Sequence, residues 1–261
     1  MLRLKRSLLA LILAVCCLVL AAGPALAEKR LDRIVESKII RVGTTGDYLP
    51  FCMLENGKYY GHDVDVMQML AKELGVEIEW VHTTWPTIMK DFHADKFDVA
   101  VGGLARTLTR AKVAELLPPY APFGKVALMR KEHKDRFTSV EAMNQPDVRV
   151  IKNPGGTNET FALTHLSKAR ISTHQYNAEI PGLIAEGKGD IMITENDEAI
   201  SHVKKDPRLH AGFLDKPLTP INFKGFMLQK DDRDFVRVMN YLWDLLERRG
   251  KLAEAKAKWL E

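Results

Sequence analysis

Short apolar runs alternate with amphipathic stretches along this 261-residue chain, and this alternation constrains its fold more than any other feature. A short apolar run bounded by turn residues predicts a buried strand, whereas apolar residues spaced three and four positions apart predict one face of a helix. Strand and helix signals that follow one another in this way indicate an α/β fold.

The alternation falls into two sets. In the first we expect strands at 39–45, 76–81 and 97–104 and helices at 63–75 and 87–96. The second begins near residue 123, with strands at 125–130, 148–151, 169–174 and 190–194 and helices that open at 153–159 and 180–189. A strand at 225–230 then precedes one long amphipathic helix from Asp232 to the end.

Two α/β lobes account for this order of elements. We expect the chain to cross between them at 119–123 and 217–223, which would return the C-terminal helix to the first lobe. The predicted division is 28–121 with 220–261 for lobe 1, and 122–219 for lobe 2. A ligand cleft is expected between the lobes, where the ends of strands and helices meet.

Residues 1–27 have the features of a secretory signal peptide: a basic start, an unbroken apolar stretch and the small-x-small ending Ala25-Leu26-Ala27. We therefore expect cleavage after Ala27, a periplasmic protein and no stable membrane anchor. Cys52 would then be the only cysteine left, so no disulfide forms within the mature chain.

The charge of the mature chain indicates neither a nucleic-acid partner nor a membrane surface. Cleavage removes Arg3, Lys5 and Arg6 and no acid, so 38 Lys and Arg residues fall to 35 against 34 Asp and Glu. The eight His residues are scattered without paired ligand spacing, and no Ser lies in G-x-S-x-G. We expect no metal site, no cofactor and no hydrolase chemistry.

Several motifs resemble known families. The segment GHDVDVMQMLA at 61–71 is similar to the signature of periplasmic polar-amino-acid binding proteins, in which His62 replaces an aromatic or aliphatic residue. The segments at 31–51, 83–92, 95–103 and 153–162 resemble the cyclohexadienyl dehydratases, a lineage of enzymes within that fold. This resemblance covers about Leu31 to Leu260. It implies a two-lobed, periplasmic-binding-protein-like (type II) fold and the conversion of prephenate to phenylpyruvate and of arogenate to phenylalanine.

Arg110 in RTLTR follows a predicted strand at the place where this family presents an arginine to a ligand carboxylate. A guanidinium can hold a carboxylate by two parallel hydrogen bonds. The alternative is an exposed arginine at a helix start. Arg106 occupies a position that is usually apolar in the family, and it could serve a second anionic group or be a surface charge.

The motif NPGGTNE at 153–159 follows a strand and opens a helix, so its free backbone N–H groups and the helix dipole converge on one point. Two glycines allow a ligand to approach, and Thr157 or Asn158 could cap the helix. The spacings of phosphate-binding and dinucleotide-binding loops are absent. Gly156, Thr157 and Asn158 are therefore predicted to bind a carboxylate, although a plain strand-to-helix turn has the same pattern.

Three further segments supply candidate ligand contacts. Asp47 and Tyr48 follow the first strand, and Trp85 follows a neighbouring one, so their side chains could enclose a ring or simply pack. Lys125 matches a lysine of the dehydratases and could neutralise a carboxylate, although a solvated lysine is the ordinary alternative.

The acidic segment TEND, followed by Glu198, carries the predicted chemistry. The resemblance assigns Glu198 as the general acid and Glu195 to the place where binding proteins have an aspartate for the ligand ammonium. Loss of CO2 from the ring expels hydroxide, which needs a proton. Glu198 could keep that proton when the cleft closes beside Glu195 and Asp197. The alternative is an acidic helix start with no chemistry.

Two hypotheses therefore remain open. In the first, a cofactor-free dehydratase holds a small carboxylate substrate. In the second, a non-catalytic protein delivers an amino acid to an ABC permease, with Glu195 taking the ammonium and Arg110 the carboxylate.

Overall fold

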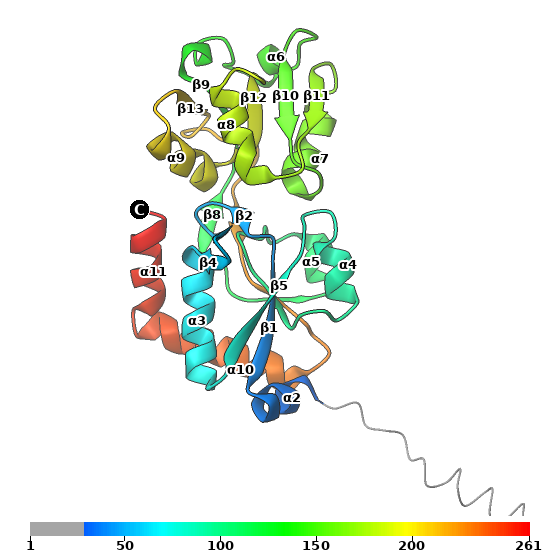
Figure 1. Ribbon diagram of the computed structural model, residues 1–261, viewed down its shortest axis with the longest axis vertical. Coiled ribbons are helices and arrows are strands. Elements are labelled where there is room, and N and C mark those ends of the chain that lie inside the picture. The colour runs from blue at the N-terminus through cyan, green and yellow to red at the C-terminus, as the bar shows by residue number, and fades with distance from the viewer. Residues whose placement is uncertain (1–28) are drawn as a thin grey trace, which may run out of the picture.

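The computed structural model describes residues 29–261, which form two α/β lobes connected by two strands (Figure 1). The predicted cleavage site after Ala27 lies outside these residues. None of the helices between residues 29 and 261 has the length and apolar character needed to cross a bilayer.

Both ends of the described chain contribute to lobe 1. Its sheet has the order β5-β1-β6-β15-β7, with β1 parallel to β5 and β6, and β15 antiparallel to β6. The strands are β1 (Ile39–Thr44), β5 (Glu77–His82), β6 (Val99–Ala100), β7 (Glu115–Leu116) and β15 (Met227–Leu228). The helices are α2 (Arg30–Ser37), α3 (His62–Leu74), α4 (Ile88–His93), α5 (Leu108–Ala111), α10 (Arg233–Arg248) and α11 (Lys251–Trp259).

Lobe 2 contains a second sheet with the order β11-β10-β12-β9-β13, in which β9 is antiparallel to both of its neighbours. The strands are β9 (Lys125–Arg130), β10 (Arg149–Lys152), β11 (Arg170–Thr173), β12 (Ile191–Glu195) and β13 (Leu209–Gly212). The helices are α6 (Val140–Met143), α7 (Gly156–His165), α8 (Ile180–Ala185) and α9 (Asn196–Lys205), with short 3-10 turns at Lys131–His133 and Asn177–Glu179.

The two connecting strands are β8 (Ala121–Phe123) and β14 (Asn222–Lys224), which pair antiparallel with each other between the lobes. They lie within or beside the crossings expected from the sequence. Both belong to the hinge by position, because every lobe-2 strand comes from the segment between them.

A small sheet of β2 (Asp47–Tyr48), β3 (Cys52–Glu55) and β4 (Lys58–Tyr60) was not predicted from the sequence. The turn between β3 and β4 is Asn56-Gly57, with φ of 51° and 75°. Two successive positive φ values are typical of the tight turn that joins hairpin strands, and Asn-Gly favours it. The dipeptide is therefore a local sequence signal for this hairpin.

Two other predictions at the C-terminal end need correction. The single long helix expected from Asp232 is two helices, because Gly250 has a φ of +73° and breaks the chain between α10 and α11. The strand expected at 225–230 is limited to Met227–Leu228. Asp232 does cap α10, and its carboxylate accepts hydrogen bonds from the backbone N–H groups of Asp234 and Phe235.

Asp63, the first acid of the GHDVD segment, fastens the loop after β6. Its buried carboxylate accepts hydrogen bonds from the backbone N–H groups of Gly102 (2.9 Å) and Gly103 (2.8 Å) and from the Tyr120 hydroxyl (2.8 Å). His62 Nδ1 lies 2.8 Å from the same carboxylate, and its ring stacks on Tyr120 at 4.9 Å between centroids. The imidazole thus takes the packing place of the aromatic residue found in the family.

We expect Asp63→Asn to lower the free energy of unfolding by roughly 2–3 kcal/mol, because the amide replaces one acceptor oxygen with a donor that faces buried N–H groups. Urea unfolding followed by circular dichroism measures this loss. The exposed Asp215→Asn variant is the matched control and should stay within about 0.5 kcal/mol of the wild type. Equal midpoints for the two variants would contradict the role given to Asp63.

Candidate active site

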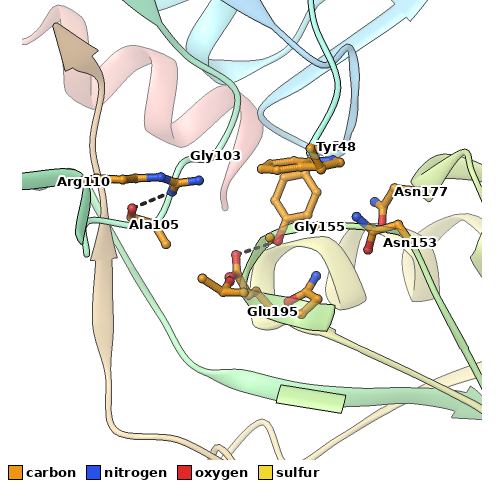
Figure 2. Close-up of a pocket in the computed structure, with 12 residues that line it drawn as sticks. Tyr48, Gly103, Ala105, Arg110, Asn153, Gly155, Asn177 and Glu195 are labelled. Carbon is orange, nitrogen blue, oxygen red and sulfur yellow. Dashed lines mark hydrogen bonds between the residues drawn. The ribbon is translucent and has the colours of Figure 1, made fainter. Parts of the chain in front are cut away.

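A cavity lies between the lobes, and most of the residues predicted to bind a ligand face it (Figure 2). Lobe 1 supplies its Tyr, its Trp and its Arg, and lobe 2 supplies the motif at the start of α7. The lining residues are Tyr48, Trp85, Gly103, Ala105, Arg110, Asn153, Gly155, Gly156, Thr157, Asn158, Asn177 and Glu195.

The cleft is closed. About 340 Å³ of space around the lining residues is free of atoms, but the centre of a water molecule fits into only about 20 Å³ of it. Such a space holds about one water molecule. A ring-containing ligand therefore needs the lobes to separate before it can bind.

Glu195, the last residue of β12, is the centre of the polar contacts. Lys125 Nζ lies 2.8 Å from its Oε1, and the Tyr48 hydroxyl donates to its Oε2 at 2.6 Å (Figure 2). Lys224 Nζ also pairs with Oε2. Burial alone would raise the pKa of Glu195, but the two lysines outweigh it and lower the pKa to about 2.

Lys224 is the functional residue that we missed in the sequence. It lies in the hinge strand β14, is fully buried and donates to the Gly103 carbonyl at 3.2 Å. Its ammonium lies 4.4–4.9 Å from the ring centroids of Tyr48, Phe51 and Phe123. The only local signal is a lysine between aromatic residues in INFKGF, which does not predict burial.

Lys125 begins β9 and is also buried. Its ammonium donates to Thr157 Oγ1 at 2.7 Å and to Asn158 Oδ1, in addition to Glu195. Burial lowers the pKa of Lys125, and Glu195 opposes that effect. The lysine therefore connects β12 to the first turn of α7.

Arg110 faces the cavity with most of its donors free. Thr107 caps the short helix α5 that carries it, and the guanidinium donates to the Ala105 carbonyl at 2.7 Å (Figure 2). Burial lowers its pKa, and Glu195 opposes this effect. Within residues 29–261 no carboxylate lies within 4 Å of Arg110. An anion in the cavity would satisfy these donors.

Arg106 does not line the cavity. Its guanidinium donates to the Leu117 carbonyl. Its aliphatic stem packs against Gly225, where an added Cβ would lie only 2.9 Å from the stem. Its backbone N–H bonds to the Phe223 carbonyl at 2.9 Å. Arg106 therefore packs on the second hinge crossing.

The NPGGTNE motif opens α7 differently from our expectation. The helix begins at Gly156, so Thr157 and Asn158 lie within its first turn and turn toward Lys125 instead of capping it. Glu159 accepts from the Gly155 N–H at 2.7 Å. Gly155 has a φ of +76°, and a Cβ there would lie 2.7 Å from Pro86 N. Because Gly155 has no side chain, the Trp85-Pro86 segment of lobe 1 can pack directly against it. Gly156 beside it faces the cavity.

Asp47 closes the mouth of the cleft. Trp85 Nε1 donates to Asp47 Oδ1 at 2.9 Å, and the Asn177 side chain donates to the Asp47 carbonyl at 3.2 Å. Burial raises the pKa of Asp47, and its hydrogen bonds oppose that effect. Because Asn177 belongs to lobe 2, its contact with Asp47 joins the two lobes.

Glu198 is fully buried in α9 and does not line the cavity itself. Asn177 Nδ2 donates to its Oε1 at 2.5 Å, Thr194 Oγ1 donates to its Oε2, and His202 Nε2 lies 3.9 Å away. Asn177 lies between Glu198 and the cavity. The sequence carried no signal for Asn177, because a lone Asn before a helix is common.

Two side-chain oxygens that face the cavity lack hydrogen-bond partners among the described atoms. They belong to Asn153 and Asn177, which lie together across the cavity from Arg110 (Figure 2). A buried amide oxygen without a partner is costly, and a water molecule in the cavity can satisfy it.

Asp197 lies near Glu195 and Lys224, and its Oδ2 has no hydrogen-bond partner among residues 29–261. Burial is the main cause that raises its pKa to about 6, and Lys224 opposes the rise. In this same part of the chain, no group of three or more His, Cys, Asp or Glu side chains is placed to hold a metal ion.

The raised pKa of Asp197 predicts how the free energy of unfolding changes with pH. The ordinary value is 3.8 and the folded value is about 6, so the folded chain binds more protons than the unfolded chain between them. The free energy of unfolding should therefore rise as pH falls through this window. Asp197→Asn should be more stable than the wild type near pH 7 and equal to it near pH 4, as urea titrations can measure. Asp215→Asn, the exposed control, should follow the wild type, and parallel curves for all three chains would refute the assignment.

Comparisons with known proteins agree with this architecture. The model of the bacterial extracellular solute-binding proteins, family 3, matches residues 40–261. Cyclohexadienyl dehydratase of Pseudomonas aeruginosa is 41% identical over 256 residues, covering 96% of this chain and 94% of the relative.

Two solved structures are also similar. One is an ancestral amino acid-binding protein, a precursor of cyclohexadienyl dehydratase, with a TM-score of 0.80 and 33% identity over 89% of this chain and all of that one. The other is an ancestral cyclohexadienyl dehydratase, with a TM-score of 0.54 and 48% identity over 90% of this chain and 98% of that one. The two lobes, the cleft and these matches together show that the chain belongs to the bacterial extracellular solute-binding proteins of family 3.

Proposed function

We propose that this chain acts as a cyclohexadienyl dehydratase, which converts prephenate to phenylpyruvate and arogenate to phenylalanine. The observation that carries the proposal is a closed cavity where free arginine donors, a buried lysine and a helix start face one another near a buried carboxyl. The 41% identity to a cyclohexadienyl dehydratase over nearly the whole chain supports the same activity. We further propose export to the periplasm with loss of residues 1–27.

Substrate binding follows from the donors in the cavity. Arg110 would hold one carboxylate by two parallel hydrogen bonds. The first turn of α7, with Thr157 and Lys125, would hold the second, because its N–H groups have no helical partners. Tyr48 and Trp85, whose rings lie 5.4 Å apart in an edge-on arrangement, would enclose the cyclohexadienyl ring.

The reaction needs one proton and no external oxidant or reductant. As the C–CO2 bond breaks, its electron pair completes the aromatic ring, and the C–O bond to the hydroxyl breaks. Hydroxide leaves as water when a carboxyl group donates a proton to it. The carboxylate then recovers a proton from solvent when the cleft opens.

Glu198 is the better candidate for this acid. Glu195 has a pKa of about 2 and is ionised near neutrality, because Lys125 and Lys224 hold its charge. Neither oxygen of Glu198 has a lysine or arginine partner among the described residues, since they contact the side chains of Asn177 and Thr194, and the resemblance to the dehydratases assigns the acid to this position. Asn177 separates it from the cavity, so the proposal requires that the substrate displaces this amide when the lobes close on it.

Closure of the lobes belongs to the proposed mechanism. The cavity has space for about one water molecule, so substrate enters an open form and then replaces the water. Loss of water around the reacting ring strengthens the contacts made by Arg110 and Lys125 and prevents unwanted proton exchange.

A second candidate function is amino-acid binding for an ABC permease. The structural likeness to an ancestral amino acid-binding protein favours it. Under this alternative the cavity binds an amino acid without changing it.

Purified mature protein should convert prephenate to phenylpyruvate, and Glu198→Gln should lower kcat by about 100-fold to 10,000-fold, because the amide cannot donate a proton to the leaving hydroxide. Product formation is followed by absorbance. Glu186→Gln, an exposed change in the same lobe, should leave kcat unchanged.

Absence of turnover by the wild type, together with thermal stabilisation by a common amino acid, would replace the dehydratase with the binding protein. Full turnover by Glu198→Gln would keep the activity but remove Glu198 from the acid role. A loss confined to Glu195→Gln would transfer that role to Glu195.

Arg110→Lys should lower kcat/KM for prephenate by about tenfold to 100-fold, mainly through KM, because a lysine keeps the charge but loses the paired hydrogen bonds. Steady-state kinetics measure the change. Arg106→Lys is the matched control, since that side chain packs on the hinge and should leave KM within about twofold. Equal effects of the two substitutions would refute the assignment of Arg110 as the carboxylate ligand.

A further inference from the structure

We propose that Lys224 makes the cavity selective for a doubly anionic keto acid over the amino acid that carries an ammonium in place of its keto oxygen. For this chain the preferred substrate would be prephenate, and arogenate would be the disfavoured one. The inference rests on the proposed function and concerns the substrate class of the same cavity.

Lys224 contacts groups from both lobes. From the hinge strand, its ammonium pairs with Glu195 of lobe 2 and donates to the carbonyl of Gly103 of lobe 1. The remaining surroundings are the faces or edges of three aromatic rings at 4.4–4.9 Å. A lysine buried in this way stays charged only with a partner, and Glu195 is that partner.

The consequence for Glu195 is that both of its oxygens are occupied. Oε1 accepts from Lys125 at 2.8 Å, with Thr157 Oγ1 at 3.5 Å, and Oε2 accepts from Lys224 and from the Tyr48 hydroxyl. In the amino-acid binding proteins that the sequence resembles, an acid at this place takes the ligand ammonium. Here Glu195 is already paired with a lysine of the protein, Lys224.

The charges around the cavity favour an anion. Arg110, Lys125 and Lys224 are the cations that line or adjoin it, and among the described residues Glu195 is the only carboxylate within 4 Å of any of them. Asp47 lies at the mouth, bonded to Trp85, and Glu198 is bonded to Asn177 and Thr194. The charged residues that line the cavity itself are Arg110 and Glu195, and because Glu195 is already paired with Lys125 and Lys224, the donors of Arg110 are left for an anion.

A keto oxygen and an ammonium meet this arrangement differently. The keto oxygen is an acceptor, and lysine N–H groups are donors. A substrate ammonium must compete with Lys125 and Lys224 for Glu195 while it lies beside both of them, and like charges close together in a buried site repel strongly. Selectivity thus comes from a repulsive element built into the site.

The experiment compares kcat/KM for prephenate and arogenate in four chains: the wild type, Lys224→Met, Glu195→Gln and the exposed control Lys205→Met. Methionine keeps the aliphatic stem of Lys224 and removes its charge, which leaves Glu195 Oε2 with the Tyr48 hydroxyl as its partner and able to accept a second donor such as an ammonium. We expect the prephenate-to-arogenate ratio to exceed ten in the wild type and to fall at least tenfold in Lys224→Met. Glu195→Gln should move the ratio the other way, and Lys205→Met should leave it unchanged.

A purely structural role of Lys224 predicts a different result: lower stability and equal losses on both substrates. A ratio that stays within twofold of the wild type in Lys224→Met would overturn the proposal, as would a wild-type ratio below one. If Lys224→Met does not fold, Glu195→Gln alone decides, since a ratio that falls in that variant contradicts the inference.

Failure of the proposed function gives a separate signature, namely no turnover of either substrate by the wild type. Selectivity is then measured by calorimetry with phenylpyruvate and phenylalanine, which differ in the same keto oxygen and ammonium. Tighter binding of phenylpyruvate, reversed or abolished by Lys224→Met, supports the inference even then. Tighter binding of phenylalanine by the wild type overturns it.

Discussion

The carboxylate of Glu195 holds the closed molecule together, because it receives hydrogen bonds from lobe 1, from lobe 2 and from the hinge. Tyr48 reaches it from β2, Lys125 from β9 and Lys224 from β14. In a buried site, removing one member of such a group leaves an uncompensated charge, which costs far more than the contact itself contributes. The contacts that close the cleft are therefore the same contacts that set the charge distribution around the cavity.

The acid-apolar-acid segment near the start of α3 has a structural role in which its two carboxylates serve different partners. Residues two positions apart on a helix lie about 200° apart around its axis, so Asp63 and Asp65 face opposite sides. Asp63 holds the loop of Gly102 and Gly103, whereas Asp65 accepts from Trp259 Nε1 at 2.7 Å and from Lys258 at 2.6 Å. One short motif thus fastens both the cavity loop and the C-terminal helix.

The sequence predicted the elements that have a local cause. The period of apolar residues located most strands and helices of both lobes, and the strand-to-helix motif at residues 153–159 located one wall of the cavity. The break between helices α10 and α11 was not predicted, because Gly250 lies inside an amphipathic pattern that continues on both sides of it. A single glycine there is compatible with one helix or two, and packing of α11 beside α3 decides it.

The residues that the sequence did not reveal are those whose role depends on distant partners. Lys224 is buried beside three aromatic rings that come from other segments, and Asn177 contacts Asp47 of lobe 1 and Glu198 of α9, both far from it in the sequence. No spacing along the chain encodes either neighbourhood. Conversely, Arg106 is only four residues before Arg110 in the sequence, yet it packs on the hinge whereas Arg110 faces the cavity.

Gly155 has a consequence for the conformational equilibrium of the whole molecule. In the closed form its backbone lies directly against the Trp85-Pro86 peptide of the other lobe, with no space for even a methyl group. Any side chain at this position would act as a wedge between the lobes. The hydrogen atom that glycine carries in place of Cβ thus sets how completely the two lobes can meet.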